Sequence, residues 1–146
     1  MRVRGILLPF DTKTPSGLLY PAEETTESLK KTDIDTLFVT HGGDNGLGTQ
    51  ANLKDVVGVA AALDLFDNRV ELVADILEEI EAGAQIAALI RAGNVQKFGF
   101  NPIGTGAALP PSGNVEDEDA PLVVQHYSLR TVAITAGNAE PLREES

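Results

Sequence analysis

The sequence contains no cysteine among its 146 residues. This absence excludes a disulfide framework, a thiolate nucleophile and a zinc site built from cysteine. A chain of this length lies within the usual size of one domain, and it can bury enough surface to fold without cross-links. Its apolar content of 42% is ordinary for a globular protein. We therefore expect a single domain that is stabilised by its core.

Basic residues are scarce as well. Eleven lysines and arginines face twenty-two acidic residues, for a formal net charge of -11. Proteins bind the phosphate backbone of nucleic acids through clustered Lys and Arg, so this balance argues against a nucleic-acid partner. The same charge favours solubility and would attract a basic partner.

Long apolar runs are also missing. No stretch of the chain approaches the length of a membrane span, so no membrane partner is expected. Residues 1–9 are basic and then apolar, but the apolar part is too short for a signal peptide. This segment instead predicts a first strand over residues 2–9.

The patterns that are present predict a mixed α+β domain. Pro21 and the charges that follow it predict a helix over residues 22–31, and Asp75 with Glu78 predicts a capped helix that ends near Gly93. Asp67-Asn68 has the chemistry of a hairpin turn between two strands. The β-prone runs that predict strands are residues 2–9, 18–20, 34–40, 56–66, 69–74, 95–100 and 122–136.

The remaining segments are polar. Residues 101–106 are predicted to form a tight turn, and residues 110–120 an acidic linker. After Gly137 the chain is polar, which indicates a peripheral segment. We therefore expect one domain over residues 1–137, which includes the acidic loop 110–120, and a C-terminal tail over residues 138–146.

Only two histidines are available for acid–base chemistry. His41 ends an apolar strand in front of a glycine-rich loop, and His126 lies inside the predicted strand 122–136. A histidine at a strand end can act as a general base toward a serine. The alternative is that each is an ordinary strand or loop histidine without a catalytic role.

The order of several short motifs resembles the prohead maturation proteases of tailed bacteriophages, which are related to the herpesvirus assembly protease. The resemblance extends to about Pro141. It implies a small, mostly antiparallel β-barrel or curled sheet flanked by two or more helices, with His41 as the strand-borne catalytic histidine and His126 in the place of a second histidine. The motifs that carry it are residues 15–23, 38–41, 57–59, 89–93, 98–104 and 126–132.

One residue departs from this pattern. The family needs a serine nucleophile where the sequence has Asn101, within Gly-Phe-Asn-Pro-Ile-Gly. A serine hydroxyl attacks when a histidine takes its proton, whereas the nitrogen electrons of an amide are delocalised into the carbonyl. Asn101 therefore predicts a pseudo-protease in which His41, Asn101 and His126 are vestigial triad positions and none is active.

The serines offer poor substitutes for the missing nucleophile. Ser112 follows two prolines in the linker, and Ser16 and Ser28 are predicted to lie in a loop and on a helix surface. Ser128 is two residues from His126, and strand alternation places the two on one face. No turn is predicted that would present any of these serines to both histidines.

Other site chemistries fit less well, and no cofactor or metal is expected. Residues 42–48 are glycine-rich but lack the Gly-Lys-Ser/Thr ending of a phosphate loop. His41 with Asp44 supplies only two metal ligands. The acidic run 116–119 could bind a hard cation, but its adjacent spacing favours a solvated linker.

Three functions follow as expectations. The first is a non-catalytic protein of a tailed-phage head, a decoration, cement or assembly component of the virion that binds the major capsid protein through lattice contacts or as a homo-oligomer. The second is an active prohead maturation protease that cleaves scaffold and coat proteins, with His41 as base, His126 orienting it, and amides near Gly99 or Gly104 as the oxyanion hole. The third is an unrelated α/β binding domain.

Overall fold

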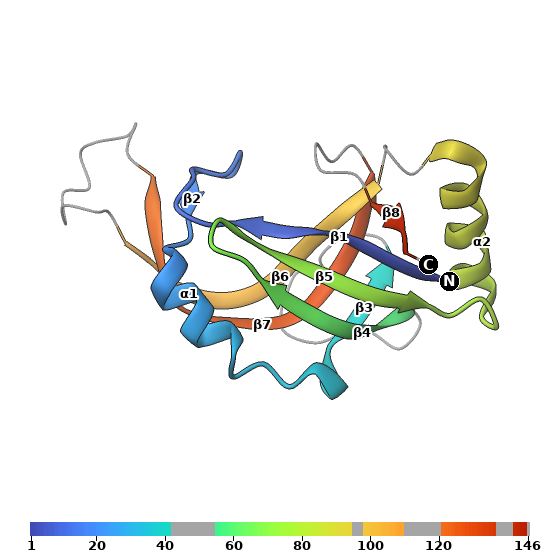
Figure 1. The fold of residues 1–146 in the computed structure, drawn as a ribbon, viewed down its shortest axis with the longest axis horizontal. Helices are drawn as coiled ribbons and strands as arrows, with labels where there is room; N and C mark the ends of the chain where they lie inside the picture. The colour runs from blue at the N-terminus through green and yellow to red at the C-terminus, as the bar shows by residue number, and fades with distance from the viewer. Residues whose placement is uncertain (42–54, 95–97, 110–120, 137–141, 146) are drawn as a thin grey trace.

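The protein is described by a computed structural model that covers residues 1–41, 55–94, 98–109, 121–136 and 142–145. One eight-stranded sheet forms the body, and two helices flank it (Figure 1). The elements are β1 (Arg2–Pro9), β2 (Leu18–Leu19), α1 (Ala22–Leu29), the 3-10 turn η1 (Ile34–Thr36), β3 (Phe38–His41), β4 (Val56–Leu65), β5 (Arg69–Ile76), α2 (Glu81–Leu89), the π-helical turn η3 (Ile90–Asn94), β6 (Phe98–Leu109), β7 (Leu122–Ala136) and β8 (Arg143–Glu144). No helix in these described ranges is long and apolar enough to cross a membrane.

The sheet is mostly antiparallel and is organised around β7. The strand order is β2-β7-β3-β4-β5-β1-β8, and β6 pairs with β7 in addition. Only β2 and β3 run parallel to a neighbour, and for both that neighbour is β7. β6 covers one edge of β7 along its length, so β2 and β3 share the other edge. Residues that flank β7 on either side are therefore brought together.

The sheet curls into a half-barrel around an aliphatic core. The fully buried side chains come from strands that lie far apart in the sequence, among them Val3, Val39, Leu72 and Val132. The C-terminal segment links the two ends of the curl, because the Leu142 amide donates to the Phe98 carbonyl at 3.0 Å while β8 pairs with β1. Figure 1 shows β8 between β1 and the start of β6. Leu142 itself is buried, so these described residues are part of the packed body rather than peripheral.

The predicted fold class and most predicted strands are confirmed. Strands 2–9 and 122–136 have the expected bounds, and β4 and β5 form the hairpin around Asp67-Asn68, with Leu65 opposite Val70. Helix α1 begins at Ala22 as expected, and its first amide accepts the side-chain cap of Asp11, whose Oδ1 is 3.1 Å from the Ala22 nitrogen. The linker 110–120 and the glycine-rich loop 42–48 lie outside the described residues.

Three predicted boundaries are wrong. The second helix begins at Glu81, because Asp75 belongs to β5 and its carboxylate accepts two hydrogen bonds from Arg2, at 2.8 and 3.0 Å. The predicted strand 34–40 is split into η1 and β3, since Asp33 caps a short 3-10 turn through the Asp35 amide.

The third wrong boundary is the expected turn at residues 101–106, which is instead the middle of β6. The strand continues there because β7 supplies a partner for it along this length. Pro102 is tolerated because, in the described residues, β6 pairs with β7 alone and so is an edge strand that does not need every amide donor.

Ion pairs connect the start of the chain to the end of α2. Glu78 accepts hydrogen bonds from the Arg91 guanidinium and, at 3.0 Å, from the N-terminal amine. These bonds lower the pKa of Glu78 from 4.5 to about 2. The hydrogen bonds from Arg2 likewise lower the pKa of Asp75. Both carboxylates are therefore more acidic in the folded protein than in the unfolded chain.

We expect the protein to lose stability as the pH falls from about 4.5 toward 2. A carboxyl group whose pKa is depressed by folding contributes stability above its unfolded value of 4.5, and this contribution is lost as the pH falls through the folded value of about 2. The urea midpoint, measured at a series of pH values, checks this. The Glu78→Gln variant should have a smaller pH dependence than the parent, and an equal dependence would contradict the assignment.

Candidate functional site

Asn101 and His41 lie on the two strands that flank the C-terminal half of β7. Asn101 in β6 is opposite Ala133, and Ala133 is opposite Thr40 on its other side, one residue before His41. Adjacent strands are spaced by about 4.8 Å, which places the backbones of Asn101 and Thr40 about 10 Å apart. The structure therefore brings these two predicted site positions into one region.

Their side chains nevertheless belong to opposite faces of the sheet. Paired residues on neighbouring strands point to the same side, and successive residues alternate. His41 shares a row with Ile134 and Phe100, both buried in the core, whereas Asn101 shares a row with Ala133 and Thr40. Asn101 is exposed. In this register a base at His41 does not face a nucleophile at position 101.

His41 has an acidic neighbour that the sequence did not reveal. Its Nε2 lies 3.7 Å from Oδ1 of Asp55, which precedes β4, and both side chains are 42% exposed. A carboxylate at this distance can orient an imidazole and stabilise its protonated form. The sequence gap of 14 positions between the two residues, much of it outside the described ranges, left no spacing signal for this pair.

His126 does not join the other two positions. It lies seven residues before Ala133 along β7, a separation of about 20 Å for extended chain. The expected convergence of His41, Asn101 and His126 is therefore not found. The interpretation of His41 and Asn101 as vestigial positions stays a prediction, and His126 belongs to a different place in the molecule.

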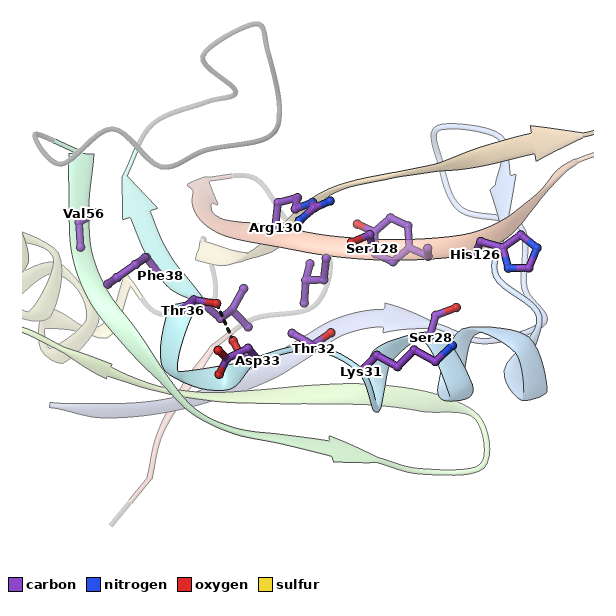
Figure 2. Close-up of a pocket in the computed structure, with 13 residues that line it drawn as sticks. Ser28, Lys31, Thr32, Asp33, Thr36, Phe38, Val56, His126, Ser128 and Arg130 are labelled. Carbon is purple, nitrogen blue, oxygen red and sulfur yellow. Dashed lines mark hydrogen bonds between the residues drawn. The ribbon is translucent and has the colours of Figure 1, made fainter.

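That place is a groove between the helix α1 and the middle of β7, which we call the α1–β7 groove. It has a volume of about 650 Å³. In Figure 2, Ser28, Lys31 and Thr32 lie on one wall, and His126, Ser128 and Arg130 lie on the other. His126 and Ser128 thus share a side, as their spacing predicted. The further lining residues are Asp33, Thr36, Leu37, Phe38, Val56, Tyr127 and Leu129.

Two bulges in β7 shape this wall. The register with β6 shifts between Ile103 and Gly104 and again between Thr105 and Ala107, each time with one extra residue in β7. At the second bulge, His126 has a φ of 53°, a conformation that few non-glycine residues adopt. Bulges turn side chains away from regular alternation, and here His126 and Arg130 line the groove.

Gly104 permits this irregular pairing. A Cβ at this position would overlap the carbonyl oxygen of Ser128 and lie 2.8 Å from the Tyr127 hydroxyl. The close backbone approach therefore requires glycine. Its role is different from the oxyanion role considered from the sequence, because its near neighbours are the bulged backbone of β7 and not a histidine.

The floor of the groove is aromatic and protected from solvent. Tyr127 is 6% exposed and packs edge-to-face on Tyr20, with ring centroids 5.2 Å apart. Burial raises the pKa of Tyr127 well above its usual range, so its phenol stays protonated at neutral pH. It supplies packing, since a protonated phenol cannot act as a general base.

No catalytic or metal-binding constellation forms in the described part of the chain. Within it, neither histidine is hydrogen-bonded to a serine hydroxyl, and no group of three or more His, Asp or Glu side chains is placed to hold a metal ion. Asp44, Ser112 and the acidic run 116–119 lie outside the described residues. The described features with potential for binding or chemistry are thus the His41–Asp55 pair and the α1–β7 groove.

The curled half-barrel with its two helices is a prohead-protease-like fold. The bacteriophage T4 capsid assembly protease gp21 has a TM-score of 0.72 with this chain at 18% sequence identity, over 92% of this chain and 79% of that one. No protein family model and no curated protein sequence matches the chain. The fold implied by the order of the short motifs is therefore confirmed, and an identity of 18% shows the fold alone.

Proposed function

We propose that the protein is a non-catalytic component of a tailed-phage head, a decoration, cement or assembly protein that keeps a protease-derived fold. The observation that carries this proposal is Asn101. It is exposed on β6 beside the strand that ends in His41, in the segment where the resemblance places a serine nucleophile. An amide cannot form the acyl-enzyme on which such a protease depends.

The surroundings of Asn101 support the same conclusion. Strand alternation directs its side chain away from the face of His41. Ser128 and Ser28, the described serines nearest to a histidine, line the α1–β7 groove with His126. That groove is about 20 Å along β7 from Asn101, so neither serine replaces a nucleophile beside His41.

The major capsid protein is the proposed partner, in the virion or during head assembly in the host cytoplasm. The fold likeness to a capsid assembly protease supports a role at the head. Exposed strand edges such as that of β6 offer backbone groups for lattice or self-association contacts.

Co-assembly with the cognate major capsid and scaffold proteins tests the proposal. We expect the purified protein to co-sediment with one or more capsid forms and to leave both proteins uncleaved on denaturing gels. The His41→Ala variant should bind capsids as the parent does. Failure to bind any capsid form, together with absence from virions, would reject the head-protein role.

The second candidate is an active maturation protease, and the His41–Asp55 pair is the observation that favours it. Cleavage of scaffold or coat protein that disappears in His41→Ala would establish that alternative. Labelling of Ser112 or Ser128 by a serine-directed fluorophosphonate would do the same.

Restoring a serine is expected to leave the protein inactive. In Asn101→Ser the new hydroxyl would replace an exposed side chain on the face opposite His41, so no base would take its proton. The gel assay with scaffold and coat protein measures this, and the parent protein is the control. Cleavage by Asn101→Ser at more than about a hundredfold above the parent would contradict the register argument, because that is the least a correctly placed base contributes.

A further inference from the structure

The α1–β7 groove holds the cations of the described residues that have no acidic partner. Lys31 and Arg130 both line it, both are exposed, and neither forms an ion pair or hydrogen bond within the described chain. Every other described lysine or arginine is engaged: Arg2, Arg4, Lys30, Arg69, Arg91 and Arg143 form ion pairs, and Lys13 has an interaction partner as well.

This placement is unexpected for so acidic a protein. With a net charge of -11, a surface cation has many possible carboxylate neighbours. In the groove, the acidic lining residue is Asp33, and its Oδ1 already accepts from the Asp35 amide at 3.1 Å. His126 adds a third basic group on the wall of Arg130. The groove is therefore a local basic site within an acidic surface, and it favours a carboxylate-bearing ligand.

The same groove follows an open strand edge. On the edge of β7 opposite β6, β2 pairs with Leu122 and Val123, and β3 pairs from Val132 onward. Between these two segments, residues 124–131 have no strand partner on that edge among the described elements. An open edge of this kind can hydrogen-bond to an extended peptide, with side-chain pockets adding specificity.

We propose that the α1–β7 groove binds an extended acidic segment of a partner protein. The segment lies along residues 124–131 of β7, and its carboxylates contact Lys31 on one wall and Arg130 on the other. Ser28, Thr32 and Ser128 add hydroxyl groups for hydrogen bonds to it. This inference does not depend on the capsid role, since it concerns the recognition of an acidic chain and neither its source nor its cleavage.

Titration of the full-length protein with a defined peptide tests the proposal. The probe is a blocked octapeptide of alternating valine and glutamate, with the valine–glutamine octapeptide as the neutral control. Calorimetry gives the affinity, and amide chemical-shift changes locate the site. We expect saturable binding, with the largest shifts at residues 126–130 and at the end of α1, and binding of the neutral peptide weaker by about tenfold or more.

Matched variants assign the binding to the two cations. The double variant Lys31→Ala/Arg130→Ala should weaken binding of the acidic peptide by about tenfold or more, because each lost charge-assisted contact is worth at least one factor of ten. Lys30→Ala is the control, since Lys30 is adjacent but pairs with Glu27 at 3.3 Å, and it should change the affinity by less than about threefold. All three side chains are exposed, so the variants should keep the parent's unfolding temperature.

Several results would overturn the proposal. They are the absence of saturable binding, equal affinity for the two peptides, an affinity unchanged in the double variant, and shifts confined to residues outside the groove. Binding of single-stranded DNA at the groove in preference to the acidic peptide would likewise overturn it in favour of a nucleic-acid site.

Discussion

Gly83→Ala is expected to lower the free energy of unfolding by about 3 kcal/mol or more, because overpacking against fixed backbone is among the most costly single changes. Gly83 lies in the first turns of α2 and is buried. A Cβ there would overlap the carbonyl oxygen of Leu77 and lie 3.2 Å from that of Val57. Both neighbours are backbone atoms held by the hydrogen bond from the Leu77 amide to the Val57 carbonyl, at 2.8 Å, so neither can rotate away.

The direction of this effect separates packing from helix propensity. Alanine is favoured over glycine inside a helix by about 1 kcal/mol, so propensity alone predicts that Gly83→Ala stabilises. Ala84→Gly is the matched control, because Ala84 is exposed on the same helix and should lose only that amount. Urea unfolding of the parent and both variants measures the difference. A stabilised Gly83→Ala variant would mean that α2 does not pack on the β4 and β5 ends as described.

Glu71→Gln is the second large effect, with an expected loss of about 2 to 3 kcal/mol. The Glu71 side chain is only 4% exposed and lies among three guanidinium groups. It accepts from Arg69 at 2.7 Å and from Arg4 and Arg143 at 3.2 Å. Burial alone would raise the pKa of Glu71, but the hydrogen bonds and charges of these arginines outweigh it and lower the pKa. A neutral amide would leave the three cations without their shared anion.

Position in the fold explains why this residue matters. Arg69 belongs to β5, Arg4 to β1 and Arg143 to β8, so Glu71 joins the C-terminal segment to the sheet. Glu27→Gln is the control, because Glu27 and Lys30 form an exposed pair that is expected to contribute less than about 0.5 kcal/mol. Equal urea midpoints for Glu71→Gln and Glu27→Gln would show that the arginines are stabilised by solvent or by their other partners, Asp64 and Glu145.

The candidate site was predictable only in part. The positions of His41 at a strand end and of Asn101 in a strand-forming segment follow from local patterns, and the structure places them on neighbouring sides of β7. Their faces and the distance to His126 depend on strand register, which a single sequence does not encode. The basic groove was missed because Lys31 and Arg130 lie 99 positions apart and each looks like an ordinary surface cation in its own segment.

The sequence by itself determined the elements whose signals are local. The alternation and length of β1 and β7, the Asp-Asn turn between β4 and β5 and the start of α1 after Pro21 all depend on neighbouring residues, and each was placed correctly. Only the tertiary structure decided what Asp75, Glu71, Gly83, Leu142 and Lys31 do, because their partners come from distant strands. Sheet curvature and register bring these partners together, and both are set by the packing of the whole core.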